Sequence, residues 1–144
     1  MMALTNLRVI EVIKYPDDYN PIAEYYQQIE SGLVVCDKIR RTYKKLYEDL
    51  TDETSEYYYS ARRANHVIEF FENYCHHSKG KYGGKLVILE LWEKALLAAV
   101  FGFIDIEGNR KYREALLIVG KKNGKSLIAS GGPPQNARIT VCVK

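Results

Sequence analysis

Residues 114–126 read Glu-Ala-Leu-Leu-Ile-Val-Gly-Lys-Lys-Asn-Gly-Lys-Ser, and this stretch decides the fold class. Its first half, residues 114–119, is short and almost continuously apolar, which is typical of a fully buried strand in a parallel sheet. A glycine-containing loop ending in Gly-Lys-Ser follows at once, and Leu127-Ile128-Ala129 then opens a helical pattern. Strand, loop and helix in this order are the context of a phosphate-binding loop, so the sequence predicts the beginning of a parallel α/β nucleotide-binding sheet.

The predicted loop suits phosphate because of its charge and geometry. Small residues let backbone N–H groups converge on phosphate oxygens, and a helix N-terminus adds the positive end of its dipole. Lys125 would reach the β- and γ-phosphates of ATP, and the Ser126 hydroxyl would ligate Mg²⁺. The usual pattern, G-x-x-x-x-G-K-[ST], has its first glycine where this chain has Val119, and Gly120 stands one residue late. The alternative to a phosphate site is a lysine-rich surface turn.

Composition excludes several classes of protein. The 144 residues suffice for one domain, and a hydrophobic content of 47% supports a buried core. The net charge of +3 fits neither a disordered chain nor a strongly basic nucleic-acid coat protein. The longest uncharged apolar run, residues 95–104, is shorter than the roughly 20 residues that a bilayer span needs, so no membrane association is expected. Charge interrupts the first residues before they could form a signal peptide, which makes the cytoplasm the expected compartment.

Four amphipathic helices are predicted upstream of the strand, at residues 21–31, 36–50, 60–74 and 88–100. Asn20 and Pro21 have the chemistry of a helix start, and Gly32 that of a helix stop. The last of the four helices should turn Leu89, Trp92, Leu96 and Ala99 inward. Residues 105–110 have turn chemistry, and residues 137–143 could form a short strand.

Three other features have two interpretations each. Charges of alternating sign on residues 36–50 indicate a solvated, self-paired surface, with contact to DNA as the alternative. Cys75-His76-His77 does not suit zinc, because adjacent helical residues point in different directions. Tyr57-Tyr58-Tyr59 fills the edge of a core more readily than it stacks nucleobases.

Several short segments occur in a fixed order that resembles the N-terminal part of the large terminase subunit of tailed bacteriophages and prophages. The resemblance covers residues 20–129, most of the chain. It rests on Asn20-Pro21-Ile22, Ile29-Glu30-Ser31-Gly32, Phe70-Phe71-Glu72, Cys75-His76-His77-Ser78-Lys79-Gly80, Gly84-Lys85, Leu89-Glu90-Leu91-Trp92, Phe101-Gly102-Phe103, Arg110-Lys111-Tyr112-Arg113-Glu114 and Lys122-Asn123-Gly124-Lys125-Ser126.

Large terminases are ATP-driven motors that thread viral DNA into a capsid and cut it with a C-terminal nuclease domain. The resemblance implies a Walker A loop that binds ATP and Mg²⁺, formed by Gly120, Lys122, Asn123, Gly124, Lys125 and Ser126. This family carries a variant loop rich in basic residues, which accounts for the shifted glycine. It also implies a catalytic role for Lys121 beside Lys125, because relatives often have an arginine there that stabilises charge on the γ-phosphate.

The same resemblance assigns adenine contact to Trp92 and Glu93, where relatives have Trp-Gln. A carboxylate accepts hydrogen bonds but donates none when ionised, so Glu93 cannot reproduce the two-way contact of glutamine with adenine. The partners implied are double-stranded viral DNA, the small terminase subunit and the portal protein, and the location is the cytoplasm of the bacterial host.

The expected fold is an α-rich α/β protein, with a helical N-terminal region followed by the first strand and P-loop of an incomplete parallel-sheet P-loop NTPase domain. The predicted boundaries are an N-terminal extension at 1–19, the helical region at 20–103, the start of the ATPase domain at 104–130 and an atypical tail at 131–144. The tail begins Gly131-Gly132-Pro133-Pro134, which stops a helix abruptly.

No Walker B carboxylate and no nuclease follow the loop, which suggests a truncated or frameshifted terminase product that is not active alone. Two alternatives are a non-catalytic helical docking module for a terminase partner, the portal or DNA, and an inactive prophage relic.

Overall fold

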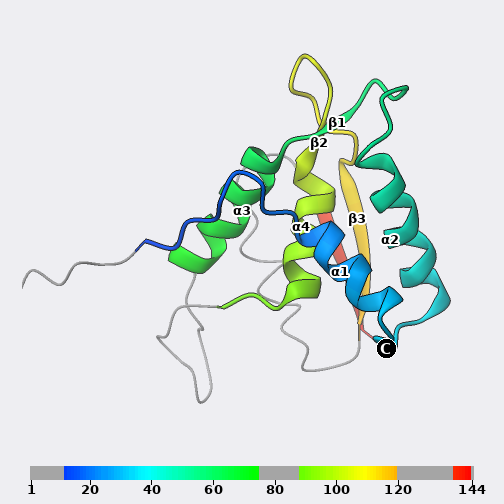
Figure 1. The fold of residues 1–144 in the computed structure, drawn as a ribbon. Coiled ribbons are helices and arrows are strands. Elements are labelled where there is room, and N and C mark those ends of the chain that lie inside the picture. The colour runs from blue at the N-terminus through cyan, green and yellow to red at the C-terminus, as the bar shows by residue number, and fades with distance from the viewer. Residues whose placement is uncertain (1–11, 75–87, 120–137, 144) are drawn as a thin grey trace, which may run out of the picture.

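The computed structural model describes residues 12–74, 88–119 and 138–143 and is rich in helix (Figure 1). Its elements are α1 (Pro21–Glu30), α2 (Asp37–Asp49), β1 (Tyr58–Tyr59), α3 (Ala61–Tyr74), α4 (Leu91–Gly102), β2 (Phe103–Ile104), β3 (Glu114–Val119) and β4 (Arg138–Val143). All four predicted helices are therefore present, and so is the strand predicted near the end of the chain. No helix in the described ranges is long and apolar enough to cross a membrane.

The ends of α1 follow its sequence signals closely. The Asn20 side chain accepts a hydrogen bond from the Ala23 N–H, and Pro21 occupies the first helical position. After the helix, Gly32 adopts a φ of +112°, a conformation that glycine reaches without a Cβ penalty. The predicted start and stop of this helix are confirmed.

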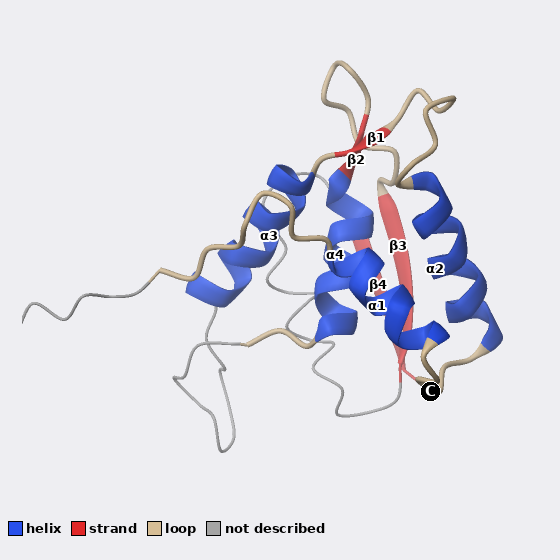
Figure 2. Ribbon diagram, in the orientation of Figure 1, coloured by secondary structure: helices blue, strands red, loops and turns tan. Residues whose placement is uncertain are grey.

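α4 is the central helix of the domain, lying between α1 and α3, and Figure 2 shows β3 on the side of α4 that faces α2. It begins at Leu91, three residues later than predicted, because Glu90 takes the N-cap position. Leu89 and Ala99 are buried as predicted, whereas Trp92 and Leu96 are only partly buried. The most deeply buried positions are instead Ala95, Leu97 and Ala98. The apolar face predicted for this helix was too narrow, because a helix with neighbours on several sides has apolar residues nearly all round.

Two clusters of buried side chains meet along α4. One cluster gathers residues of α1, α2 and the middle of α4, and it includes Ile22, Ile29 and Phe103. The other cluster lies between α3 and α4 and includes Phe71 and Leu97, which have no exposed surface. Trp92 contacts both clusters. The helical region thus has one continuous apolar interior.

β3 and β4 form a two-stranded parallel sheet whose register runs from Glu114 opposite Arg138 to Val119 opposite Val143. Ala115 and Ile139 pack against the cluster between α3 and α4, so one face of the sheet is covered. On the other face, the side chains of Leu116 and Ile118 are 64% and 51% exposed. The prediction of a fully buried strand was therefore wrong for this face, because successive residues of a strand point to opposite sides and the described helices cover only one.

An extended strap of residues 12–19 precedes α1 and lies along α3 (Figure 1). The strap is held by side chains of α3. Asn73 makes two hydrogen bonds to the backbone of Ile13, and Glu69 accepts one from the Tyr15 N–H. Asn65 donates to the Pro16 carbonyl. The predicted N-terminal extension at 1–19 is thus anchored to the helical region through its second half.

Candidate functional site

The predicted phosphate loop begins where β3 ends. Gly120, Lys121, Lys122, Asn123, Gly124, Lys125 and Ser126 lie outside the described residues, but the last residue of β3 is Val119. In open α/β sheets, ligands bind beyond the carboxyl ends of the parallel strands. The loop sequence therefore leaves β3 at the end where a nucleotide would be held.

The parallel pairing of β3 with β4 adds a topological constraint. Because the two strands run in the same direction, residues 120–137 return the chain from the carboxyl end of β3 to the amino end of β4. A connection of this kind takes a dozen or more residues and usually contains a helix. The loop and the helix that the sequence predicts here lie outside the described residues.

The carboxyl ends of these strands contain no acidic side chain. β4 reads Arg-Ile-Thr-Val-Cys-Val, and the sequence has no Asp or Glu after Glu114. Within the described parts of the chain, no group of three His, Cys, Asp or Glu side chains could hold a metal ion. The Ser126 hydroxyl, which the sequence predicts as a Mg²⁺ ligand, lies outside the described residues.

Trp92 and Glu93, the pair assigned to adenine, lie in the first turn of α4. This helix begins, and β3 ends, at the lower end of the molecule in Figure 1, so the pair lies at the end of the domain where β3 ends. Both side chains have local partners there. The Trp92 Nε1–H donates to Glu90 Oε2 at 2.6 Å, and Glu93 Oε1 accepts from the Glu90 N–H at 3.1 Å.

Glu93 caps α4 and is almost fully buried, with 7% of its surface exposed. Burial raises the pKa of its carboxyl, and the nearby charge of Glu90 adds to the rise, against the hydrogen bond from the Glu90 backbone. The role that the structure gives Glu93 is therefore that of a capping residue. The sequence signal was the spacing of Glu90 and Glu93, which the interpretation as an adenine contact left unused.

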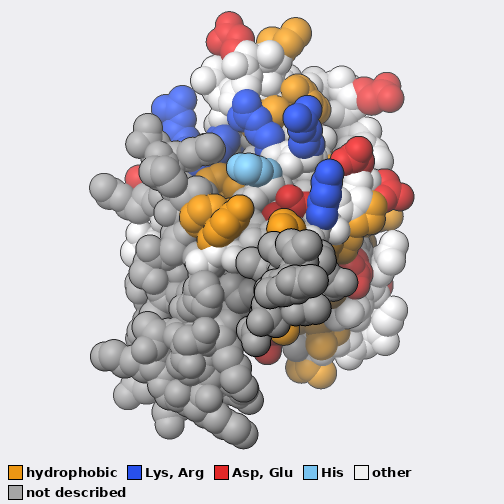
Figure 3. Space-filling view, turned by 90° about the vertical axis from the view of Figure 1, so that its left-hand side faces the viewer, with side chains coloured by type: hydrophobic (Ala, Val, Ile, Leu, Met, Phe, Trp, Pro, Cys, Tyr) orange, Lys and Arg blue, Asp and Glu red, His pale blue; other side chains and the backbone are white. Residues whose placement is uncertain are grey.

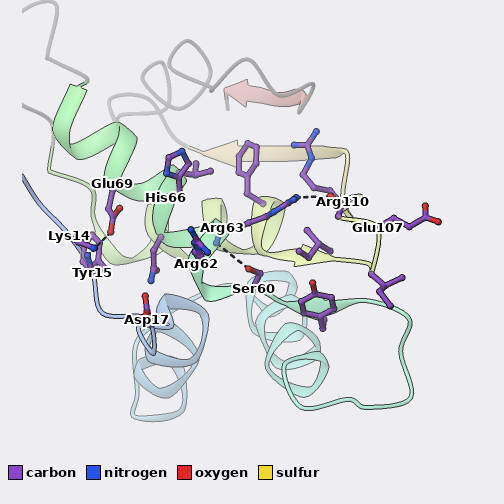
Figure 4. Close-up of a pocket in the computed structure, with 17 residues that line it drawn as sticks. Lys14, Tyr15, Asp17, Ser60, Arg62, Arg63, His66, Glu69, Glu107 and Arg110 are labelled. Carbon is purple, nitrogen blue, oxygen red and sulfur yellow. Dashed lines mark hydrogen bonds between the residues drawn. The ribbon is translucent and has the colours of Figure 1, made fainter.

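A second candidate site is a wide groove of about 1070 Å³ between α3, the strap and the turn at residues 104–110 (Figure 4). We call it the arginine groove. Its charged lining includes Lys14, Asp17, Arg62, Arg63, His66 and Arg110. Figure 3 shows Lys and Arg side chains gathered around a histidine on this face, with acidic side chains among them. The groove therefore offers cationic groups on α3 within a mixed-charge rim.

Two arginines approach each other on one wall of the arginine groove. The Arg63 Nη1–H donates to the Gly108 carbonyl at 2.8 Å, which turns its guanidinium toward Arg110 (Figure 4). Burial lowers the pKa of Arg110, and the like charges of Arg113 and Arg63 lower it further. An anion placed between these guanidinium groups would relieve their repulsion.

Asn65 lies deep in the arginine groove with 4% of its surface exposed. Its Nδ2 donates to the Pro16 carbonyl at 2.9 Å, whereas its Oδ1 has no hydrogen-bond partner among the described residues. Sequence reasoning missed this groove, because residues from the strap, α3 and the 104–110 turn meet only in the folded chain. The available signals were the Arg62-Arg63 pair at a helix start and the polar residues at positions 65, 69 and 73 of one helix face.

No family model, no curated protein and no solved structure matches this chain. The two candidate sites and the residue pattern that resembles large terminases therefore carry the functional proposals.

Proposed function

We propose that this chain is the nucleotide-binding front part of a phage large terminase subunit, and that it holds Mg²⁺-ATP on the loop at residues 120–126. The observation that carries the proposal is the position of β3. This strand runs directly into the loop sequence and pairs in parallel with β4, as a P-loop NTPase sheet requires. The α-rich architecture ahead of β3 agrees with the helical region expected before the ATPase sheet.

In this proposal the loop binds ATP mainly through its backbone and two side chains. Backbone N–H groups from Gly120 to Gly124 surround the phosphate oxygens, and Lys125 neutralises charge on the β- and γ-phosphates. Ser126 contributes a ligand to Mg²⁺. Lys121 supplies charge near the γ-phosphate without the two-pronged geometry of arginine.

Binding of ATP without turnover is the expected activity of this chain. Phosphoryl transfer to water depends on groups that position the attacking water and the metal. The sequence after the loop has no carboxylate for either task. We therefore expect ATP to bind and to remain intact.

Isothermal titration calorimetry with Mg²⁺-ATP tests the proposal. The wild-type chain should bind, and Lys125→Ala should lose most of the affinity. Lys38→Ala is the matched control, because it removes one lysine charge from the exposed surface of α2 and should leave the affinity unchanged. Equal affinity in the wild type and Lys125→Ala, or no binding in either, contradicts the proposal.

A second candidate function, docking to DNA or to a terminase partner, is favoured by the arginine groove. Cationic side chains along Arg62, Arg63 and Arg110 suit phosphate groups, and such contacts weaken as salt rises. We expect binding of labelled double-stranded DNA to fall with salt and to fall further in the Arg62→Ala/Arg63→Ala double variant. The Arg40→Ala/Lys44→Ala variant, with equal charge loss on α2, is the control. If the affinity for DNA changes neither with salt concentration nor in the Arg62→Ala/Arg63→Ala variant, DNA does not bind in this groove.

Pull-down with the small terminase subunit and with the portal protein completes the docking test, since docking should survive Lys125→Ala. The relic alternative predicts a self-associating chain, because the exposed apolar face of β3 has no cover among the described residues. A monomer in light scattering removes that alternative.

A further inference from the structure

A second groove, distinct from both candidate sites, lies between α2 and β3. Its volume is about 430 Å³, within the range of ligand-binding pockets. The floor is apolar and comes from α4, with Leu96, Ala99 and Val100. Ala115 and Leu116 of β3 form one wall, and α2 forms the other. We call it the β3-edge groove.

This groove lies beside the first half of β3, residues 114–116, at the edge that faces away from β4. Among the described lining residues α2 contributes several and β4 none, and Figure 2 shows β3 between α2 and β4. In the described part of the chain, no backbone hydrogen bond joins residues 114–119 to anything but β4. The N–H and C=O groups on the groove side of β3 therefore face a ready-made space for another strand.

The sheet itself favours such an addition. Two-stranded sheets have marginal stability, and parallel sheets normally occur with more strands and with both faces covered. Here the outer face carries Leu116 and Ile118, both more than half exposed. A strand added beside β3 would widen the sheet and cover part of this apolar surface.

The charges on the α2 wall indicate which strand would fit. Arg41 and Lys45 line the groove one helical turn apart, which is about 6 Å along the helix axis. Alternate side chains of an extended chain are about 6.7 Å apart, nearly the same spacing. Lys45 lies 3.6 Å from Asp49 but its side chain is 73% exposed, so it can turn toward a new carboxylate. Glu114 is the acidic residue of the lining and stands at the start of β3.

We propose that the β3-edge groove binds an extended segment of a partner protein, with alternating apolar and acidic residues, as an added strand of the sheet. The apolar residues face the α4 floor, and the carboxylates at alternate positions pair with Arg41 and Lys45. Backbone pairing with β3 supplies affinity, and the alternating side chains supply specificity. The proposal is independent of nucleotide binding.

The probe is a fluorescein-labelled peptide of eight residues in which valine and glutamate alternate, with capped ends, and the readout is fluorescence anisotropy. We expect binding that weakens about tenfold or more in the Arg41→Glu/Lys45→Glu variant, because two favourable pairs become repulsive. Arg40→Glu/Lys44→Glu carries the same charge change on exposed positions of α2 outside the groove and should bind as the wild type does. An equal loss of peptide affinity in both double variants overturns the site. A peptide with lysine in place of each glutamate that binds as tightly as the glutamate peptide also overturns it.

Two N-methylated peptides test the backbone pairing. Methyl groups on every odd or every even amide remove the donors of one edge while the side chains stay in place. One of the two peptides should lose binding and the other should keep it, because only one edge of the segment faces β3. If both N-methylated peptides still bind, strand addition is contradicted.

Two further measurements distinguish a partner segment from a second copy of the chain, and peptide binding from nucleotide binding. A concentration-dependent dimer of the peptide-free chain that Arg41→Glu/Lys45→Glu abolishes would mean that a second copy occupies the groove, against the proposal. Lys125→Ala should bind the peptide with wild-type affinity, so failure of the ATP proposal and failure of this one give different results.

Discussion

Replacement of Asn73 by alanine should release the strap from α3. The Asn73 Oδ1 accepts from the Ile13 N–H at 2.8 Å, and its Nδ2 donates to the Ile13 carbonyl at 2.9 Å. A hydrogen bond in a folded protein contributes about 0.5–1.5 kcal/mol net, so losing two costs about 1–3 kcal/mol. Because no backbone ladder among the described residues supports this contact, the cost should appear as local opening of the strap.

Amide hydrogen exchange at Ile13 measures that opening directly. A free-energy loss of 1–3 kcal/mol corresponds to exchange that is faster by about five- to 150-fold, while protection in α4 should change little. Asn73→Asp keeps an acceptor for the Ile13 N–H and should give an intermediate rate. An Asn73→Ala variant with the wild-type exchange rate at Ile13 would refute the role of these bonds.

Three further variants probe other parts of the fold. Glu93→Gln should raise the melting temperature at pH 7, because a carboxyl whose pKa is raised by burial disfavours folding once it is ionised. This gain in melting temperature should disappear as the pH falls below 4.5, the ordinary pKa of a Glu carboxyl, because the wild-type side chain is then neutral as well. A difference in melting temperature that persists in acid contradicts this reasoning. Gly32→Ala should cost about 1–2 kcal/mol in urea unfolding through its φ of +112° alone, since no atom lies within 4 Å of the added Cβ. Phe71→Ala removes a side chain with no exposed surface and should cost about 3–5 kcal/mol, and a loss below 1 kcal/mol would mean that this interior is not packed as described.

Signals that lie within a few residues of one another predicted the helices well. Asn20, Pro21 and Gly32 fixed the ends of α1 because caps and stops depend on local hydrogen bonds and on local φ values. The start of α4 was predicted three residues too early because the prediction followed the apolar pattern from residue 88, whereas the structure has Glu90 at the N-cap position. Glu93 is the usual third-position residue of a capping box, but the N-cap residue here is Glu90 where Ser or Thr is usual, so the sequence shows only half of the signal.

Features that depend on distant parts of the chain could not be predicted in the same way. The exposure of Leu116 and Ile118 depends on which elements cover β3. An apolar run in the sequence does not show whether one face of the strand or both faces are covered. The arginine groove depends on the approach of Lys14, Arg63 and Arg110 from three separate segments. Periodicity identifies the face of one helix, but not the loops that meet it.

The place of Trp92 between the two clusters of buried side chains has a consequence for how the domain unfolds. Trp92 is the only tryptophan in the chain, so its fluorescence reports on both halves of the interior at once. Because α4 forms part of each cluster, neither half can lose its packing while the other keeps it. Heat or denaturant should therefore abolish the helical signal and the tryptophan signal in a single transition, which makes α4 the element through which the helical region behaves as one cooperative unit.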